Sequence, residues 1–205
     1  PPPPPPGVAQ AKVQAMDMMS GTKPGSADDG AGSADIDLSK VTARKNLNET
    51  AFFLPHLTVE NDDLVKLTFT MPEALTTWKF LGFAHGLDGE GGILTRETVT
   101  QKDLMVQPNP PRFLREGDTL VFTAKVTNMS ETPQKGKIRL ALTDPATEKA
   151  RDADFGLSQP EQTFEIPARE SRSFAWPLNV PNGAGILAYK VVAATDNLSD
   201  GEEAL

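Results

Sequence analysis

Residues able to perform chemistry are few and widely spaced in this sequence. The only histidines are His56 and His85, and the chain contains no cysteine. A zinc site usually needs several nitrogen or sulfur ligands at close spacing, so we expect no metal site. Serine, histidine and aspartate all occur, but the G-x-S-x-G nucleophile elbow does not. The sequence therefore indicates no catalytic residues, no cofactor and no enzyme.

Acidic side chains gather near the end of the chain, in the stretch "DNLSDGEE". This stretch contains Asp196, Asp200, Glu202 and Glu203. Calcium prefers oxygen ligands, but the spacing of an EF-hand loop is absent. The simpler interpretation is a turn of solvated carboxylates.

The overall charge excludes several classes of partner. The 205 residues include 20 Lys and Arg against 28 Asp and Glu, for a formal net charge of -8. An acidic chain gains no affinity from counterion release, so neither nucleic acid nor anionic lipid is an expected partner. No apolar run approaches the roughly 20 residues that span a bilayer, so we expect no membrane insertion. Because the chain begins at Pro1 rather than at a methionine, we expect a fragment whose targeting signal lies elsewhere.

Residues 1–41 differ in composition from the rest of the chain. They open with "PPPPPPG", which favours a polyproline II rod without backbone donors. The following "VAQAKVQAMDMMSG" has apolar residues at turn spacing, which is compatible with a transient helix. The Gly- and Ser-rich "TKPGSADDGAGSADIDLSK" is typical of a flexible linker. We therefore predict a disordered tether, for which the simplest role is a spacer.

From Thr42 onward, short β-branched and aromatic runs alternate with Gly, Pro, Asn and Asp. The predicted strands are 63–71, 76–86, 92–100, 120–127, 136–144, 161–168, 171–181 and 185–196. No helical period is sustained here, which favours antiparallel, fibronectin-III-like β-sandwiches. We expect a partial sandwich at 42–100, because about 60 residues are too few for seven strands. A complete sandwich is expected at 101–197, followed by an exit strand or linker at 198–205.

Two tryptophans and several separated motifs add detail. Trp78 and Trp176 are interpreted as core anchors rather than ligand-stacking residues. An "RK-x-x-x-ET" motif begins at Arg44, an aromatic pair follows, and a "P-x-x-x-T-x-W" turn ends at Trp78. The later stretch "TQKDLMVQPNPPRFLREGDTLVFTAKVTN" reads as the opening strands of another domain.

In this order, the motifs resemble the segment that follows the bait region in the α2-macroglobulin family. Three segments are similar to sequences of the bacterial branch of that family: "LPHL", "QKDLMV" and "PRFLREGD". The residues that carry the resemblance are Arg44, Lys45, Glu49, Thr50, Phe52, Phe53, Pro72, Thr76 and Trp78. The likeness covers 42–205 and implies macroglobulin domains, with "SDGEEAL" resembling the exit toward CUB and thioester domains.

The resemblance implies a protease inhibitor in which cleavage of a bait segment triggers entrapment. Residues 1–41 then occupy the bait position, and their candidate cleavage residues are Lys12, Met16, Met18, Met19, Lys23 and Lys40. Arg44, Lys45 and Glu49 are expected to form a hinge, with Glu49 on the folded side and the two basic residues on the mobile side. The family's thioester needs a cysteine, so that domain is expected downstream.

The resemblance also implies partners and a location. Expected partners are proteases and other macroglobulin, CUB or thioester domains of the same parent chain. The expected location is the periplasm or the outer-membrane-associated cell envelope. The alternative function is a structural or adhesive β-sandwich module of a large envelope protein, with residues 1–41 as its spacer.

Overall fold

A computed structural model describes residues 36–59 and 64–205 of the chain. This part consists of antiparallel β-sheets and one short 3₁₀ helix, which confirms the all-β prediction. None of its helices is long and apolar enough to cross a bilayer. The chain divides into two compact units: the described residues of one lie in Thr50–Thr70, and those of the other in Ser33–Glu49 and Met71–Leu205. The predicted tether falls outside the described residues as far as position 35.

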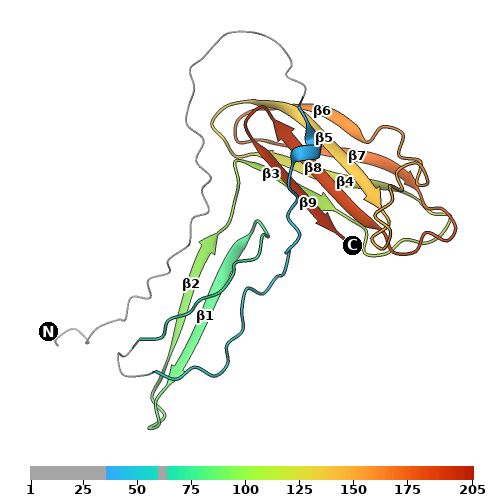
Figure 1. Ribbon diagram of the computed structural model, residues 1–205. Coiled ribbons are helices and arrows are strands. Elements are labelled where there is room, and N and C mark those ends of the chain that lie inside the picture. Colours follow the sequence, from blue (N-terminus) through green and yellow to red (C-terminus); the bar gives the residue numbers. More distant parts are fainter. Residues whose placement is uncertain (1–35, 60–63) are drawn as a thin grey trace. The chain divides into compact units, whose positions relative to one another are not determined.

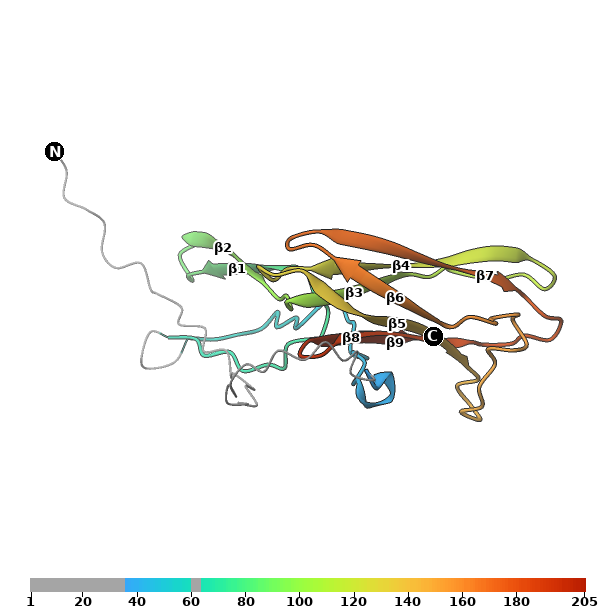
Figure 2. The ribbon, with the colours of Figure 1, turned by 90° about the horizontal axis from the view of Figure 1, so that it is seen from above.

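A sandwich of seven strands forms most of the second unit. Its strands are β3 (Leu104–Asn109), β4 (Thr119–Asn128), β5 (Gln134–Thr143), β6 (Glu161–Ile166), β7 (Ser171–Asn179), β8 (Ala188–Thr195) and β9 (Ser199–Ala204). One sheet has the order β3-β4-β7 and the other has the order β6-β5-β8-β9 (Figure 1). Figure 2 shows these sheets as two layers. This arrangement confirms the predicted fibronectin-III-like sandwich.

The core between the two layers follows from strict alternation along the strands. On β5 the side chains of Ile138, Leu140 and Leu142 are buried, and the residues between them face outward. Trp176 on β7 is only 1% exposed, and its Nε1 donates to the Pro160 carbonyl at 3.1 Å. The prediction that Trp176 anchors the core is therefore confirmed.

Pro177, the residue after Trp176, shows why β7 lies at the edge of its sheet. It lacks a backbone N–H and cannot donate to a second neighbouring strand. β7 pairs only with β4, where Pro177 lies opposite Val121. The position of Pro177 therefore agrees with the edge position of β7 in the sheet.

The sandwich continues past residue 197, where the sequence predicted an exit strand or linker. Ser199–Ala204 form β9, which pairs along its length with β8, so that Tyr189 lies opposite Ala204. The acidic run made a linker as plausible as a strand here, because carboxylates are depleted in strands unless they have partners.

Residues 42–100 contain a hairpin of β1 (Thr77–His85) and β2 (Gly91–Val99). These strands agree with the predictions at 76–86 and 92–100. The strand predicted at 63–71 is wrong, since 64–71 contain no strand in the structure. An alternating pattern needs a pairing partner to become a strand, and none of the described strands pairs with this stretch. Instead, the ring centroid of Phe69 lies 4.4 Å from that of Phe52.

Trp78 on β1 also differs from its prediction. Its side chain is half-buried rather than enclosed in a core, and its Nε1 donates to Thr100 Oγ1 at 3.0 Å. A two-stranded sheet has no second layer of its own to enclose a tryptophan. The partial-sandwich assignment of 42–100 stays a prediction.

Candidate functional site

Residues 36–46, here called the strap, run along the four-stranded sheet of the sandwich. The strap begins with a 3₁₀ helix (Leu38–Lys40), whose preceding Asp37 accepts the Ser39 N–H at 3.0 Å. Figure 2 shows this helix beside β8, on the side away from the three-stranded sheet. An exposed helix of one turn is marginal alone, so its position depends on what the strap packs against.

An apolar contact fixes the first half of the strap. Leu38 and Val41 are both 7% exposed and pack against Val192 and Ala194 of β8. The alternate residues of β8, such as Val191, belong to the core of the sandwich. Both faces of β8 are therefore buried, one by the core and one by the strap.

The second half of the strap pairs with the edge of β9. The Arg44 N–H donates to the Gly201 carbonyl at 2.8 Å, and the Glu203 N–H donates to the Arg44 carbonyl at 3.0 Å. A Cβ added at Gly201 would lie 2.7 Å from Val192 Cγ1 and 3.4 Å from Ala43 Cα. A glycine is favoured here because a Cβ would collide with the Val192 side chain of the neighbouring strand β8, whereas its distance to the strap would be an ordinary contact.

The side chain of Arg44 ends in a fork-shaped ion pair inside the protein. Its Nε lies 3.0 Å from Asp200 Oδ1, and its Nη2 lies 3.2 Å from Oδ2. Arg44 is 6% exposed and Asp200 is 0% exposed. Two parallel charged hydrogen bonds of this kind fix both direction and distance.

Asp200 and Arg44 also connect the two sheets of the sandwich. The Val106 N–H of β3 donates to Asp200 Oδ2 at 2.8 Å, and Arg44 Nη2 donates to the Val106 carbonyl at 2.8 Å. Val106 belongs to the three-stranded sheet and Asp200 to the four-stranded sheet. The strap residue is thus tied to both layers at one point.

Two more charges complete what we call the charge cluster, which comprises Arg44, Lys102, Asp200 and Glu202. Lys102 Nζ lies 2.9 Å from Asp200 Oδ1, and Arg44 Nη2 lies 3.2 Å from Glu202 Oε2. The Tyr189 hydroxyl donates to Glu202 Oε1 at 3.2 Å. Two cations therefore balance two carboxylates, and no buried side-chain nitrogen or oxygen of the described residues lacks a hydrogen-bond partner.

Burial changes the acidity of the groups at the margin of the cluster. Loss of solvent raises the pKa of Glu202 above its ordinary 4.5, although the charge of Arg44 opposes the rise. Burial, together with the neighbouring charge of Glu202, raises the pKa of the Tyr189 phenol. Desolvation penalises the charged form in both cases.

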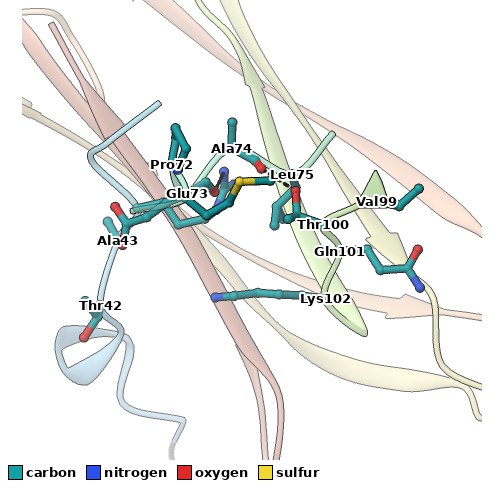
Figure 3. Close-up of a pocket in the computed structure, with 12 residues that line it drawn as sticks. Thr42, Ala43, Pro72, Glu73, Ala74, Leu75, Val99, Thr100, Gln101 and Lys102 are labelled. Carbon is teal, nitrogen blue, oxygen red and sulfur yellow. Dashed lines mark hydrogen bonds between the residues drawn. The ribbon is translucent and has the colours of Figure 1, made fainter. Parts of the chain in front are cut away.

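Glu73 holds the strap from another side. Its Oε2 accepts the Lys45 N–H at 2.8 Å and the Asn46 N–H at 3.0 Å, and these bonds lower the pKa of Glu73 below 4.5. An open groove runs between the strap, the segment around Glu73 and the segment that carries Lys102 (Figure 3). Charged groups line part of it, but they already bond one another.

The chemistry of this site is anchoring. The cations and carboxylates saturate one another, which leaves no free nucleophile and base within hydrogen-bond distance. Among residues 36–59 and 64–205, no three His, Cys, Asp or Glu side chains are arranged to hold a metal ion. The cluster fixes one short segment of chain to two sheets, and we call the Arg44–Asp200 pair the clasp.

The three predicted hinge residues differ in burial. Glu49, expected on the folded side, is exposed, whereas Arg44, expected on the mobile side, is among the most buried charged residues described. The side chain of Lys45 is exposed, whereas its backbone N–H donates to Glu73. Whether this stretch acts as a hinge stays a prediction. Arg44 alone could not reveal its position, since its partner lies 156 residues away.

The interpretation of "DNLSDGEE" as a solvated turn is wrong for Asp200, which is fully buried, and right for Asp196, which is exposed. Of the candidate cleavage residues, only Lys40 is described, and its side chain is 83% exposed beside Asp37. The others lie outside the described residues: Lys12, Met16, Met18, Met19 and Lys23.

Comparison with known proteins connects this arrangement to a family. The profile of the Alpha-2-macroglobulin family matches residues 50–140. The Alpha-2-macroglobulin of Thermotoga maritima is 24% identical over 163 residues, which cover 79% of this chain and 10% of that protein. Residues 50–140 therefore resemble the alpha-2-macroglobulin family. The chain spans about a tenth of the length of this alpha-2-macroglobulin.

Solved alpha-2-macroglobulin structures share the fold. Trypsin-activated alpha-2-macroglobulin from Escherichia coli aligns with a TM-score of 0.54 and 16% identity, over 67% of this chain and 9% of that one. Escherichia coli alpha-2-macroglobulin activated by porcine elastase gives a TM-score of 0.53 and 16% identity, over 67% and 12% of the two chains. At this identity the alignments establish the fold of the macroglobulin domains.

Proposed function

We propose that this chain is the part of a bacterial alpha-2-macroglobulin-like protease inhibitor in which a cleavable bait segment enters its macroglobulin domains. The observation that carries the proposal is the strap. It fixes the carboxyl end of the Pro-, Gly- and Ser-rich segment to a rigid sandwich through a buried ion pair. The similarity to alpha-2-macroglobulins supports the inhibitor class, and the anchored segment offers a place where attack by a protease can be registered.

The composition of residues 1–41 suits a protease target. A protease needs an extended, solvated peptide, and a segment poor in large apolar residues cannot bury its backbone. The two Escherichia coli relatives are described as activated by trypsin and by porcine elastase, which supports proteases as partners here. After a cut, the strap would remain on the sandwich while the restraint between the two ends of the segment is lost.

In this proposal, 42–100 contribute part of one macroglobulin domain and the strands up to β9 form the next. Other macroglobulin, CUB or thioester domains of the parent chain would surround them, in the periplasm or at the outer membrane. The activity proposed is entrapment rather than catalysis. A thioester requires a cysteine, which this sequence lacks, so covalent capture would have to come from elsewhere in the parent.

Limited proteolysis tests the proposal directly. Trypsin, elastase and thermolysin should each make their first cuts before Ile36, as read by mass spectrometry of the fragments. The competing segment is 144–159, which is long and charged. In the structure, this loop is pinned by Phe155 and Leu157, which are 0% and 6% exposed. First cuts within this loop by all three proteases would contradict the proposal.

A further inference from the structure

The strap presents basic side chains on a docked backbone. The side chain of Lys40 is 83% exposed and that of Lys45 is 69% exposed. Their peptide bonds are nevertheless flanked by Leu38, Val41 and Arg44, whose side chains are buried. At these positions the side chain is exposed to solvent, but the backbone is held against the sandwich and is not free to enter a protease.

We propose that the apolar contact of Leu38 and Val41 with β8 and the clasp together set the carboxyl-side limit of the protease-accessible segment at Ile36. Lys40, Arg44 and Lys45 are then protected sites, although each has the chemistry that a trypsin-like protease selects. The inference rests on the proposed function for its biological meaning, because it identifies which residues decide where the bait ends. In each cut, the added protease uses one water to hydrolyse one peptide bond, leaving a carboxylate and a new amino terminus.

Two separate anchors support this limit. To bind the strap in extended form, a protease must lift Leu38 and Val41 from β8 and also break the backbone pairing of Arg44 with β9. Breaking that pairing withdraws the guanidinium from Asp200, which leaves the buried carboxylate with Lys102 and one backbone amide. Cleavage of a docked segment follows the population of its open form, so both anchors lower the rate.

The two anchors hold different parts of the strap, so their effects on cleavage can be measured separately. The apolar anchor lies around Lys40, whereas the ionic anchor lies at Arg44 and next to Lys45. Loosening the first should expose the bond after Lys40 alone. Loosening the second should expose the bonds after Arg44 and Lys45.

The experiment is a tryptic time course on the full 205-residue chain, with each cut quantified by mass spectrometry. The reference is the bond after Lys12, because Lys23 precedes Pro24 and trypsin hydrolyses Lys–Pro bonds poorly. In the wild type, cleavage after Lys12 should exceed cleavage after Lys40 or Lys45 by about tenfold or more. Equal rates at Lys12 and Lys40 would overturn the proposal without any variant.

Variants then assign the protection to its causes. Asp200→Asn keeps the size of the side chain but removes its charge, and should accelerate cleavage after Arg44 and Lys45 by about tenfold or more. Leu38→Ala should accelerate cleavage after Lys40 only. Lys135→Gln is the matched control, since it breaks an exposed ion pair with Glu165 and should change none of these rates.

The remaining outcomes are decisive as well. If Asp200→Asn does not fold, the wild-type ratio and Leu38→Ala still decide the matter. Unchanged strap cleavage in folded Asp200→Asn would show that the clasp does not set the limit. In another outcome, trypsin cuts the wild type first within 144–159, and the bonds after Lys12 and within the strap both resist. That result would contradict the proposed bait, although the strap would still be protected.

Discussion

Arg44 is the residue on which the proposed anchoring depends. Burying a guanidinium and a carboxylate together costs desolvation that their attraction only partly offsets, so the pair is weak evidence for added stability. Its geometry nevertheless specifies one docking position, because the fork accepts only a carboxylate placed as Asp200 is. A shift of the strap by one residue along β9 would separate the guanidinium from Asp200, which would keep Lys102 alone as its cation.

Removing the arginine should therefore be costly. Arg44→Met leaves Asp200 with Lys102 alone as its cation, and we expect a loss of about 3 kcal/mol in the free energy of unfolding. Urea denaturation, followed by the fluorescence of the buried Trp176, measures this loss. The exposed-pair control Lys135→Gln should change the value by less than about 0.5 kcal/mol. Equal small effects of the two substitutions would show that the clasp does not support the fold.

Glu202 should give the stability of the protein a distinctive dependence on pH. Its pKa in the folded protein is raised above 4.5, so in the window just above pH 4.5 the folded state binds more protons there than the unfolded chain. The contribution of Glu202 to stability therefore falls as the pH rises through that window. Glu202→Gln should remove this fall, as seen in urea midpoints measured from pH 4 to pH 8. Parallel profiles for variant and wild type would contradict the assignment.

Glu73 should act in the opposite direction and at lower pH. Its pKa is lowered by the Asn46 and Lys45 amides, so its contribution is complete above 4.5 and is lost as the pH falls through its folded value. Glu73→Gln should flatten the acid limb of the profile while leaving the window above 4.5 unchanged. A variant profile that differs from wild type only above pH 4.5 would contradict this role.

The sequence indicates one half of this site. The resemblance points to the motif that begins at Arg44, but nothing in the motif indicates that Arg44 is buried. Local composition made Asp200 part of an acidic, solvated run, since a carboxylate's partner 156 residues away leaves no local trace. The alternation of Asp200 and Glu202 within a predicted exit strand was the one available signal that they share a face.

At the scale of the element, β7 shows how much one strand can specify. Its sequence predicted a strand with a core tryptophan, which the structure confirms, and its proline agrees with the edge position in the sheet. The strand predicted at 63–71 failed although its alternation was as regular. Pairing is a property of two segments, and the sequence of one cannot establish it. The strap was missed for a related reason, because its single-residue pairing with β9 has no periodic pattern.

Trp176→Ala tests whether the core depends on β7 as described. Removing a fully buried indole leaves a cavity, and we expect a loss of about 3–5 kcal/mol in the free energy of unfolding. Thermal unfolding monitored by circular dichroism provides the measurement. Val121→Ala is the control, because Val121 lies opposite Pro177 on the outer face and is 58% exposed. A Trp176→Ala protein that melts within a degree or two of wild type would place the indole outside the core.

At the scale of the whole molecule, this chain spans about a tenth of the length of the relatives it matches. In the proposed function it acts within a longer parent protein. A tether with one end on a rigid sandwich can restrain that parent only while it is intact. Cleavage would free the tether but leave the strap docked. A switch of this kind requires a parent with two conformations that the intact and cut tether favour to different extents.

Small-angle X-ray scattering of the parent protein, before and after a single cut in residues 1–35, tests the central claim most directly. The account predicts compaction or domain rotation after the cut, together with loss of the bound protease's activity on large substrates but not on small ones. Entrapment would be contradicted if the scattering profile stayed unchanged while the strap remained docked before and after the cut, and if the attacking protease stayed fully active on large substrates. It would favour a structural module with a spacer instead.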